Sequence, residues 1–334
     1  MRRIDSAIII PARNEERRIG TCLRSLAPQL GCDTLVVVVA NNCTDQTEAA
    51  ARAALPGPGL LVANLELRAD QGVGTARRMG CEMAIRAAPA LRSLLTTDAD
   101  CVVAPDWVAR NRQHLNAFDA VCGAVDPMPE ERDILRHIPA QDGWKEATYR
   151  ALVLRFYDAI HPEPHNPLPH HGETPGASLA FGLGAYCAVG GFSDRRTGED
   201  RDLVRRMRHN GMKVGHVADV RVAASCRLTG RAEGGMAQTI KGRLSNPDFR
   251  IDDTLPPVRW LLEHAARGTL PVWPPELPPE QCLRPSDLPA QIARLGHVLD
   301  HFGQPGTGAE PAQLPATAPA AQGGAMGMRE RRLT

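Results

Sequence analysis

Short apolar runs alternate with helical patterns along the first hundred residues of the chain. The runs are rich in β-branched residues and leucine, as buried strands are, and they span residues 7–10, 35–39, 60–67 and 94–97. Between them, apolar residues recur at helical spacing from residue 17 onward, over 46–54 and over 76–87. This alternation predicts an α/β fold with a doubly wound, mostly parallel sheet and helices on both faces. Ligands of such a sheet lie beyond the C-terminal ends of its strands.

The pattern is less regular after residue 126. Residues 126–140 are rich in proline and charge, and a helix is predicted over 144–159. Residues 161–171 contain four histidines and four prolines, a composition that predicts a mobile loop. The histidines of this loop, His161 to His171, could bind a metal, but a solvated loop explains them as well. Regular patterns return in three later segments, residues 177–188, 198–211 and 214–222.

Composition divides the chain into three predicted parts. Residues 1–240 carry the alternating strands and helices and are predicted to form one domain. Residues 241–303 form an irregular, proline-rich C-terminal extension with one helical stretch at 286–302. Residues 304–334 are rich in Gly, Ala, Pro and Gln and are predicted to be disordered.

Charge and cysteine content narrow the class of protein. The chain has 39 basic and 38 acidic residues and no dense basic run, so nucleic acid is not an expected partner. Its nine cysteines include no C-x-x-C pair, which favours reduced thiols in a cytoplasmic protein. The N-terminal apolar run stops at Pro11, short of a signal peptide, and no run is long enough for a transmembrane segment. We therefore expect a soluble, cytoplasmic protein, and the sequence carries no signal of oligomeric state.

Two carboxylates stand one residue apart where the apolar run at 94–97 ends. Side chains at i and i+2 of a strand point to the same face, so Asp98 and Asp100 could converge on one cation. Like charges this close repel each other unless a cation neutralises them. Hard oxygen ligands suit Mg²⁺ or Mn²⁺, and these ions suit diphosphates. The alternative is a solvated turn at the end of a strand.

A second acidic pair, Glu199 and Asp200, opens the helix predicted from residue 198. Acidic side chains in a first helical turn complement the helix dipole, so the pair could simply stabilise this helix. One carboxylate at such a place could also accept a proton as a general base.

Five motifs occur in an order typical of one enzyme family. They are residues 8–16 (IIIPARNEE), 36–47 (VVVVANNCTDQT), 72–80 (GVGTARRMG), 97–100 (TDAD) and 190–200 (GGFSDRRTGED). In this order they resemble the family 2 glycosyltransferases, inverting enzymes of the GT-A fold that transfer a sugar from a nucleotide-diphosphate donor. The resemblance covers residues 5 to 235 and implies a donor half at 1–125 and an acceptor half, with the base, at 126–240.

The resemblance implies roles for the donor side. The turn after the first strand would contact the base and ribose of the nucleotide through Pro11, Ala12, Asn14 and Glu15. Asn41 stands where the family usually has an aspartate, which leaves the base preference open. Gly74 and Arg77 match a segment near the donor, where helix N-termini and arginines favour phosphate.

The resemblance also implies the metal and catalytic residues. Asp100 would ligate Mg²⁺ or Mn²⁺, and Asp98 would contact the ribose or share the metal. His216 could complete the metal shell, although a lone histidine in a strand is more often structural. Asp200, next to Glu199, would be the general base that takes the proton of the acceptor hydroxyl.

A polar cluster follows the strand at 214–222. Ser225, Arg227 and Arg231 could hold a phosphate or an anionic acceptor, and an ordinary surface loop explains them equally well.

The predicted function is therefore a metal-dependent, inverting, hexosyltransferase-type glycosyltransferase that adds one sugar to an unidentified acceptor hydroxyl. A processive synthase is not favoured, because Pro256 stands where the Q-x-x-R-W motif of those enzymes has glutamine. Two alternatives remain at this point: a nucleotidyltransferase of similar fold and a non-catalytic protein that binds a nucleotide sugar.

Overall fold

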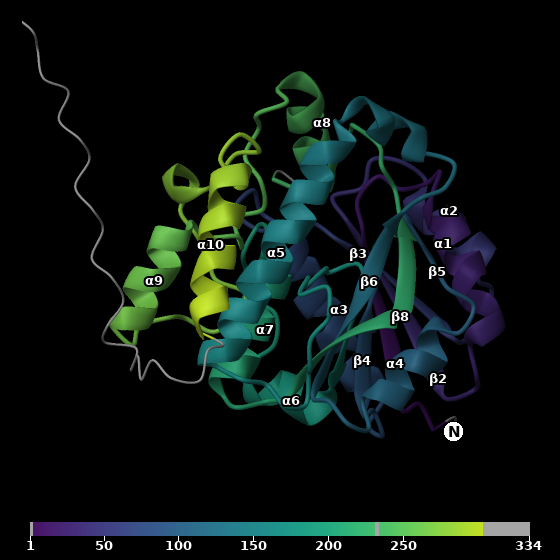
Figure 1. The fold of residues 1–334 in the computed structure, drawn as a ribbon. Coiled ribbons are helices and arrows are strands. Elements are labelled where there is room, and N and C mark those ends of the chain that lie inside the picture. The colour runs from purple at the N-terminus through teal and green to yellow at the C-terminus, as the bar shows by residue number, and fades with distance from the viewer. Residues whose placement is uncertain (1–2, 231–233, 303–334) are drawn as a thin grey trace, which may run out of the picture.

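Eight strands form one mixed sheet in the order β3-β2-β1-β4-β7-β6-β8-β5 (Figure 1). The structure is a computed structural model that describes residues 3–230 and 234–302; the predicted tail at 304–334 and Arg231 lie outside the described residues. The strands are β1 (Ser6–Ala12), β2 (Thr34–Asn41), β3 (Leu60–Leu65), β4 (Ser93–Thr96), β5 (Cys101–Val103), β6 (Ala120–Pro127), β7 (Leu179–Gly182) and β8 (Val214–Ala224).

The first four strands of the chain are parallel to one another, as the sequence predicts. β7 is antiparallel to both of its neighbours, β4 and β6. β8 is parallel to β6 and then pairs with the short edge strand β5 in the antiparallel sense. The sheet is therefore mostly parallel on its N-terminal side and mixed beyond β4.

Helices cover both faces of the sheet. The helices that pack on the sheet are α1 (Ile19–Leu26), α2 (Thr47–Ala54), α3 (Val73–Ala87), α4 (Trp107–His114), α6 (Leu183–Ala188) and α7 (Glu199–His209). Successive residues of a strand point to opposite faces, so Ile9 packs with α3, α6 and α7 while Ile8 packs with α1, α2 and α4. The predicted doubly wound α/β architecture is confirmed.

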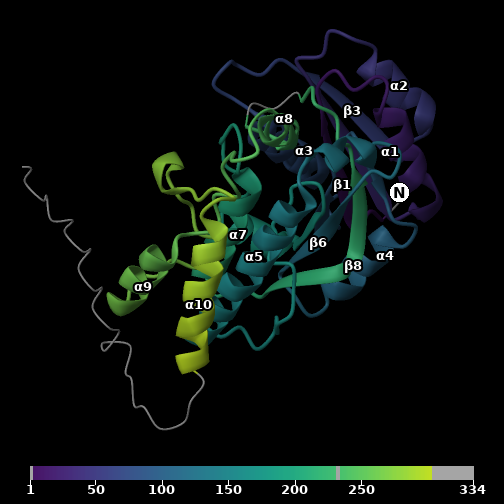
Figure 2. The same cartoon turned by 45° about the horizontal axis from the view of Figure 1, so that its top comes forward.

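A third core lies beside the sheet. It joins the long helix α5 (Ala140–Ile160) to the C-terminal segment, with Tyr149, Phe156, Leu261 and Leu295 among its buried side chains. Figures 1 and 2 show α10 (Leu288–Phe302) beside α5, on the side away from α1, and Figure 1 shows α9 (Val258–Ala266) on the far side of α10. The sequence pattern predicts α10. It does not predict α9 or the preceding helix, α8 (Met236–Ser245).

Short 3-10 turns complete the described elements, at η1 (Ala27–Gln29), η2 (Arg132–His137) and η3 (Pro279–Gln281). Residues 161–178 contain neither helix nor strand, as their proline content predicts. Among the described residues, no helix is both long and apolar enough to cross a membrane. The boundary predicted at residue 240 stays a prediction.

Candidate active site at the carboxyl ends of the strands

The predicted nucleotide-binding residues gather where β1 and β2 end. Parallel pairing sets Ala12 opposite Ala40, so the turns after the two strands are neighbours. Asn14 in the first turn has a left-handed φ of 55°, and its Oδ1 accepts a hydrogen bond of 2.7 Å from the backbone N–H of Thr44. Pro11, Ala12 and Asn41 line the same ends as buried residues. Left-handed backbone at a non-glycine residue costs free energy and is often found at functional sites.

Asp98 and Asp100 follow β4 and lie just before β5. Their carboxylate oxygens and the Sγ of Cys101 all lie within 4.8 Å of one another. Burial raises the pKa of Asp100 to about 6, Asp98 adds to this shift, and Arg227 opposes it. Burial also raises the pKa of the Cys101 thiol well above its usual range, which makes Cys101 a poor metal ligand. The two carboxylates fit a hard divalent cation.

Arg227 reaches the same site from the segment after β8. Its guanidinium donates two hydrogen bonds to the carboxylate of Glu15, and its Nη2 lies 2.9 Å from Asp100 Oδ2. Glu131 holds this segment in place, since its Oε2 accepts hydrogen bonds from the Ser225 hydroxyl at 2.7 Å and from the Cys226 N–H at 2.8 Å. The predicted donor residue Glu15 and the predicted metal ligand Asp100 thus share one arginine, a link that the sequence did not indicate.

Arg77 joins the two acidic motifs. Its guanidinium donates to Asp98 Oδ1 through Nη2 and to Glu199 Oε1 through Nη1, and the side chains of Arg77 and Glu199 are only 4% and 3% exposed. Burial opposes charge on Arg77, but Asp98 and Glu199 keep its pKa above the ordinary value. Burial raises the pKa of Glu199 and Arg77 opposes that shift. Asp98 and Glu199, far apart in the sequence, therefore flank one guanidinium.

Gly74, predicted to lie near the donor, packs against the segment that leads into α7. A Cβ built on Gly74 would come within 2.5 Å of the Ser193 carbonyl oxygen and 2.8 Å of the Arg195 carbonyl oxygen. Glycine at this position of α3 lets the chain that carries Glu199 approach closely. Gly74 therefore packs against the segment before α7, and Arg77 pairs with Asp98 and Glu199. The phosphate contacts that the sequence predicts for both residues stay a prediction.

Asp200 lies in the first turn of α7 with its carboxylate fixed by the backbone. Oδ2 accepts a hydrogen bond of 2.7 Å from the Gly176 N–H, and Oδ1 accepts one of 2.8 Å from the Arg201 N–H. Glu199 and Asp202 share this turn, where negative charge is favourable. A carboxylate held at both oxygens keeps one orientation, which suits a residue that removes a proton from a bound group.

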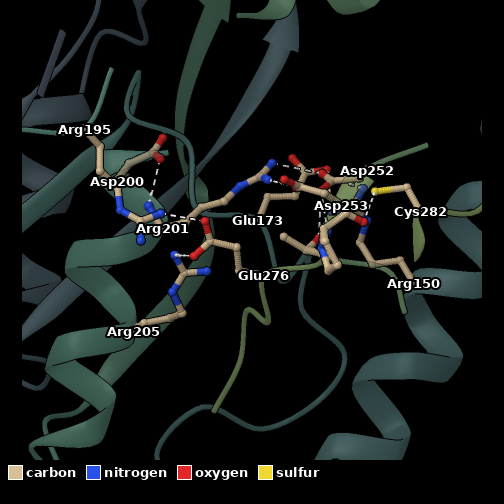
Figure 3. A network of polar contacts seen from close by, with 12 residues as sticks. Arg150, Glu173, Arg195, Asp200, Arg201, Arg205, Asp252, Asp253, Glu276 and Cys282 are labelled. Atoms are coloured by element: carbon tan, nitrogen blue, oxygen red, sulfur yellow. Dashed lines mark hydrogen bonds and ion pairs between the residues drawn. The ribbon is translucent and has the colours of Figure 1, made fainter. Parts of the chain in front are cut away.

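A network of ion pairs connects α7 to the C-terminal segment (Figure 3). Arg201 contacts Asp252 at 3.2 Å and also pairs with Asp253. Arg205 contacts Glu276 at 2.8 Å, and Arg195 contacts the other oxygen of Glu276 at 2.6 Å. Carboxylates of the C-terminal segment, which lies outside the sheet, therefore hold the helix that carries Asp200.

His216 does not join the carboxylates. It lies near the start of β8, in the same row of the sheet as Thr96 with β7 and β6 between them. Cys101, beside the carboxylates, pairs instead with Ala224 at the other end of β8. Its ring stacks on His170 with centroids 4.6 Å apart, and His171 meets it edge-on at 5.3 Å. Among the described residues, the group of three candidate ligands close enough to hold an ion is Asp98, Asp100 and Cys101. The structure gives no support to His216 or the 161–171 histidines as ligands of this ion.

Comparisons with known proteins bear on the family and the fold. Residues 7–165 match the family model described as "Glycosyl transferase family 2". The structure of S. aureus TarS 1-349 in complex with UDP-GlcNAc is similar to this chain, with a TM-score of 0.50 and 15% identity over 79% of this chain and 65% of that one. This likeness shows a common fold.

A second similar structure is glucosyl-3-phosphoglycerate synthase from Mycobacterium tuberculosis in complex with Mn²⁺, UDP and phosphoglyceric acid. It has 18% identity over 72% of this chain and 77% of that one, with a TM-score of 0.47. A search among curated proteins found no match.

Proposed function

We propose, from the match of residues 7–165 to the model of glycosyltransferase family 2, that this chain transfers one sugar, with inversion, from a nucleotide-diphosphate sugar to an acceptor hydroxyl. The observation that carries the proposal is the convergence of two acidic motifs on Arg77, with Asp98 on one side and Glu199 on the other. An inverting transfer needs a charge-stabilising site for the leaving diphosphate and a base on the acceptor side. The two motifs supply both.

Asp200 is the proposed base. As the acceptor oxygen attacks the anomeric carbon, the Asp200 carboxylate takes the proton of the hydroxyl. The hydrogen bonds from the Gly176 and Arg201 N–H groups fix its orientation, and Glu199 behind it is held by Arg77. Glu199 is therefore a positioning residue in this proposal.

Asp100, with Asp98, is the proposed holder of Mg²⁺ or Mn²⁺. The bound ion would neutralise the charge that develops on the departing nucleotide diphosphate. Pro11, Ala12, Asn14, Glu15 and Asn41 would surround the base and ribose, because they lie together beyond the ends of β1 and β2.

Turnover assays on the purified protein test this proposal. A panel of nucleotide sugars is incubated with Mn²⁺, and release of nucleoside diphosphate is followed with water or sugars as acceptors. Asp200→Asn is expected to lower turnover at least 100-fold, the scale of general-base catalysis. Asp202→Asn is the matched control, because Asp202 lies in the same helical turn and pairs with Arg206; it is expected to stay within about threefold of the wild type.

Metal use and stereochemistry have separate readouts. A nucleoside diphosphate is expected to raise the melting temperature only when Mg²⁺ or Mn²⁺ is present, and Asp100→Ala should abolish that shift. The product's anomeric configuration, read by NMR, should be opposite to that of the donor.

Two outcomes would favour the alternative functions. Release of pyrophosphate from a nucleoside triphosphate and a sugar phosphate would indicate a nucleotidyltransferase, and no turnover with any donor would indicate a binding protein.

A further inference from the structure

Arg227 occupies the carboxylate site with a positive charge supplied by the chain itself. We infer that Arg227 is a resident counter-ion of Asp100, that a divalent cation displaces it from this carboxylate, and that the displaced guanidinium then binds the donor's diphosphate. This inference rests on the proposed function and names a residue that couples metal binding to donor binding.

The first support is that the Asp100 carboxylate pairs with Arg227 and also belongs to the candidate metal group. Asp100 Oδ2 lies 2.9 Å from Arg227 Nη2, and Asp100 is also a member of the candidate metal group. A divalent ion that uses both carboxylates of this group competes with Arg227 for Asp100, because two cations at one carboxylate repel each other. Asp100 is therefore paired with Arg227 in the metal-free protein and with the ion in the metal-bound protein.

The second support is that Arg227 has a separate anchor. Both of its Nη atoms donate to the Glu15 carboxylate, and the side chains of Glu15 and Arg227 are 6% and 17% exposed. Loss of the contact with Asp100 leaves this two-point pairing intact, so the guanidinium stays at the site. Glu131 fixes the preceding residues Ser225 and Cys226, which limits how far Arg227 can move.

The third support is the charge that the donor brings. The site contains three carboxylates. Glu15 and Asp100 pair with Arg227, and Asp98 pairs with Arg77. A diphosphate entering this acidic surrounding needs more positive charge than one arginine supplies. A divalent ion together with Arg227 provides it, and arginine pairs well with phosphate through its planar fork.

The inference predicts opposite effects of one substitution on two ligands. Arg227→Gln removes a competing positive charge, so Mn²⁺ alone is expected to bind about tenfold more tightly, a scale set by charge repulsion at close range. The same change removes a phosphate partner, so ADP, CDP, GDP or UDP, whichever binds the wild type in saturating Mn²⁺, is expected to bind about tenfold more weakly.

The experiment measures Mn²⁺ binding by electron paramagnetic resonance without nucleotide, and nucleoside diphosphate binding by calorimetry. Arg221→Gln is the matched control: Arg221 lies on β8 and pairs with Asp126 at 2.6 Å, away from Asp100. It should change neither affinity by more than about twofold. Arg227→Lys keeps the charge without the fork, and it should leave Mn²⁺ affinity within about threefold while weakening the nucleotide.

The outcomes separate this inference from the proposed function. Wild-type Mn²⁺ binding that depends on Asp100 but is unchanged or weakened in Arg227→Gln overturns the inference alone. Absence of Asp100-dependent Mn²⁺ binding in both proteins overturns the inference and the metal part of the proposed function together. If Arg227→Gln does not fold, unchanged nucleotide affinity in Arg227→Lys overturns the inference.

Discussion

At the scale of single residues, Arg77 contacts carboxylates in the segment for which the motif predicts a phosphate contact. The sequence set it at the start of a helix, where arginine is expected to meet phosphate. The structure buries its guanidinium between Asp98 and Glu199. Taking one member from a buried ion pair leaves an uncompensated charge, which is strongly destabilising.

Arg77→Met is therefore expected to lower the free energy of unfolding by about 3 kcal/mol, because Glu199 stays buried without its cation. Urea denaturation measures this loss. Arg78→Met is the neighbouring control: Arg78 is 32% exposed and pairs with Asp194 at the surface, so its loss should cost less than about 1 kcal/mol.

The double variant Arg77→Met with Glu199→Gln tests the cause. If the buried charge of Glu199 is responsible, the second substitution should restore part of the lost stability. Equal losses in the Arg77 and Arg78 variants would contradict the assignment of Arg77 as the link between the motifs.

At the scale of elements, α7 depends on a part of the chain that the family match does not cover. The match ends at residue 165, whereas Asp252 and Asp253 bind Arg201 in the turn that carries Asp200. Asp252 also accepts hydrogen bonds of 2.9 Å from the N–H and hydroxyl of Thr254. Figure 3 shows these carboxylates facing Arg201 and Arg150 from the C-terminal segment.

Asp252→Asn is expected to lower turnover about tenfold or more, because a small displacement of a base is costly. Affinity for a nucleoside diphosphate should change less than about threefold, since the donor residues lie at the ends of β1, β2 and β4. The measurement is kcat beside calorimetric binding. A parallel loss of turnover and nucleotide affinity would show general damage and contradict a positioning role.

Sequence reasoning worked best for elements with a strong local period. The four parallel strands and α10 were recognisable because apolar runs and helical spacing are set by neighbours in the chain. α9 was missed because Pro256 and Pro257 precede it and it is only 9 residues long, with Val258 and Leu261 buried in the third core, beside the sheet. That burial depends on residues distant in the sequence.

At the scale of the whole molecule, His170 and His171 of the 161–171 loop pack against His216 of β8. Burial lowers the pKa of His170 to about 4 and holds that of His216 well below its usual range, and Arg208 adds to both shifts. Arg208 in turn pairs with Glu163 of the loop at 2.7 Å. These rings are therefore uncharged in the folded protein near neutral pH.

Acid should destabilise the fold through this cluster. A histidine whose folded pKa is depressed takes up its proton in the unfolded chain first, so stability is full above pH 6.5 and falls as pH drops toward 4. His170→Gln should reduce this fall by on the order of 1 kcal/mol, allowing for partial exposure of the ring. Urea unfolding at several pH values measures the slope, with exposed His209→Gln as control. An unchanged slope in His170→Gln would contradict the prediction.

The sequence by itself determined the α/β class, the succession of the early strands and helices along the chain, and the two acidic motifs. Periodicity, strand ends and helix starts are local properties of the chain, so they can be read without knowing what packs where.

Only the tertiary structure decided which charges meet. It set Arg77 between Asp98 and Glu199, Arg227 between Glu15 and Asp100, and Asp252 against the helix of the proposed base. It also placed His216 far along β8 from Ala224, the residue that pairs with Cys101 beside the carboxylates. These pairings depend on strand order and on burial, which join residues far apart in the sequence and carry no local signal.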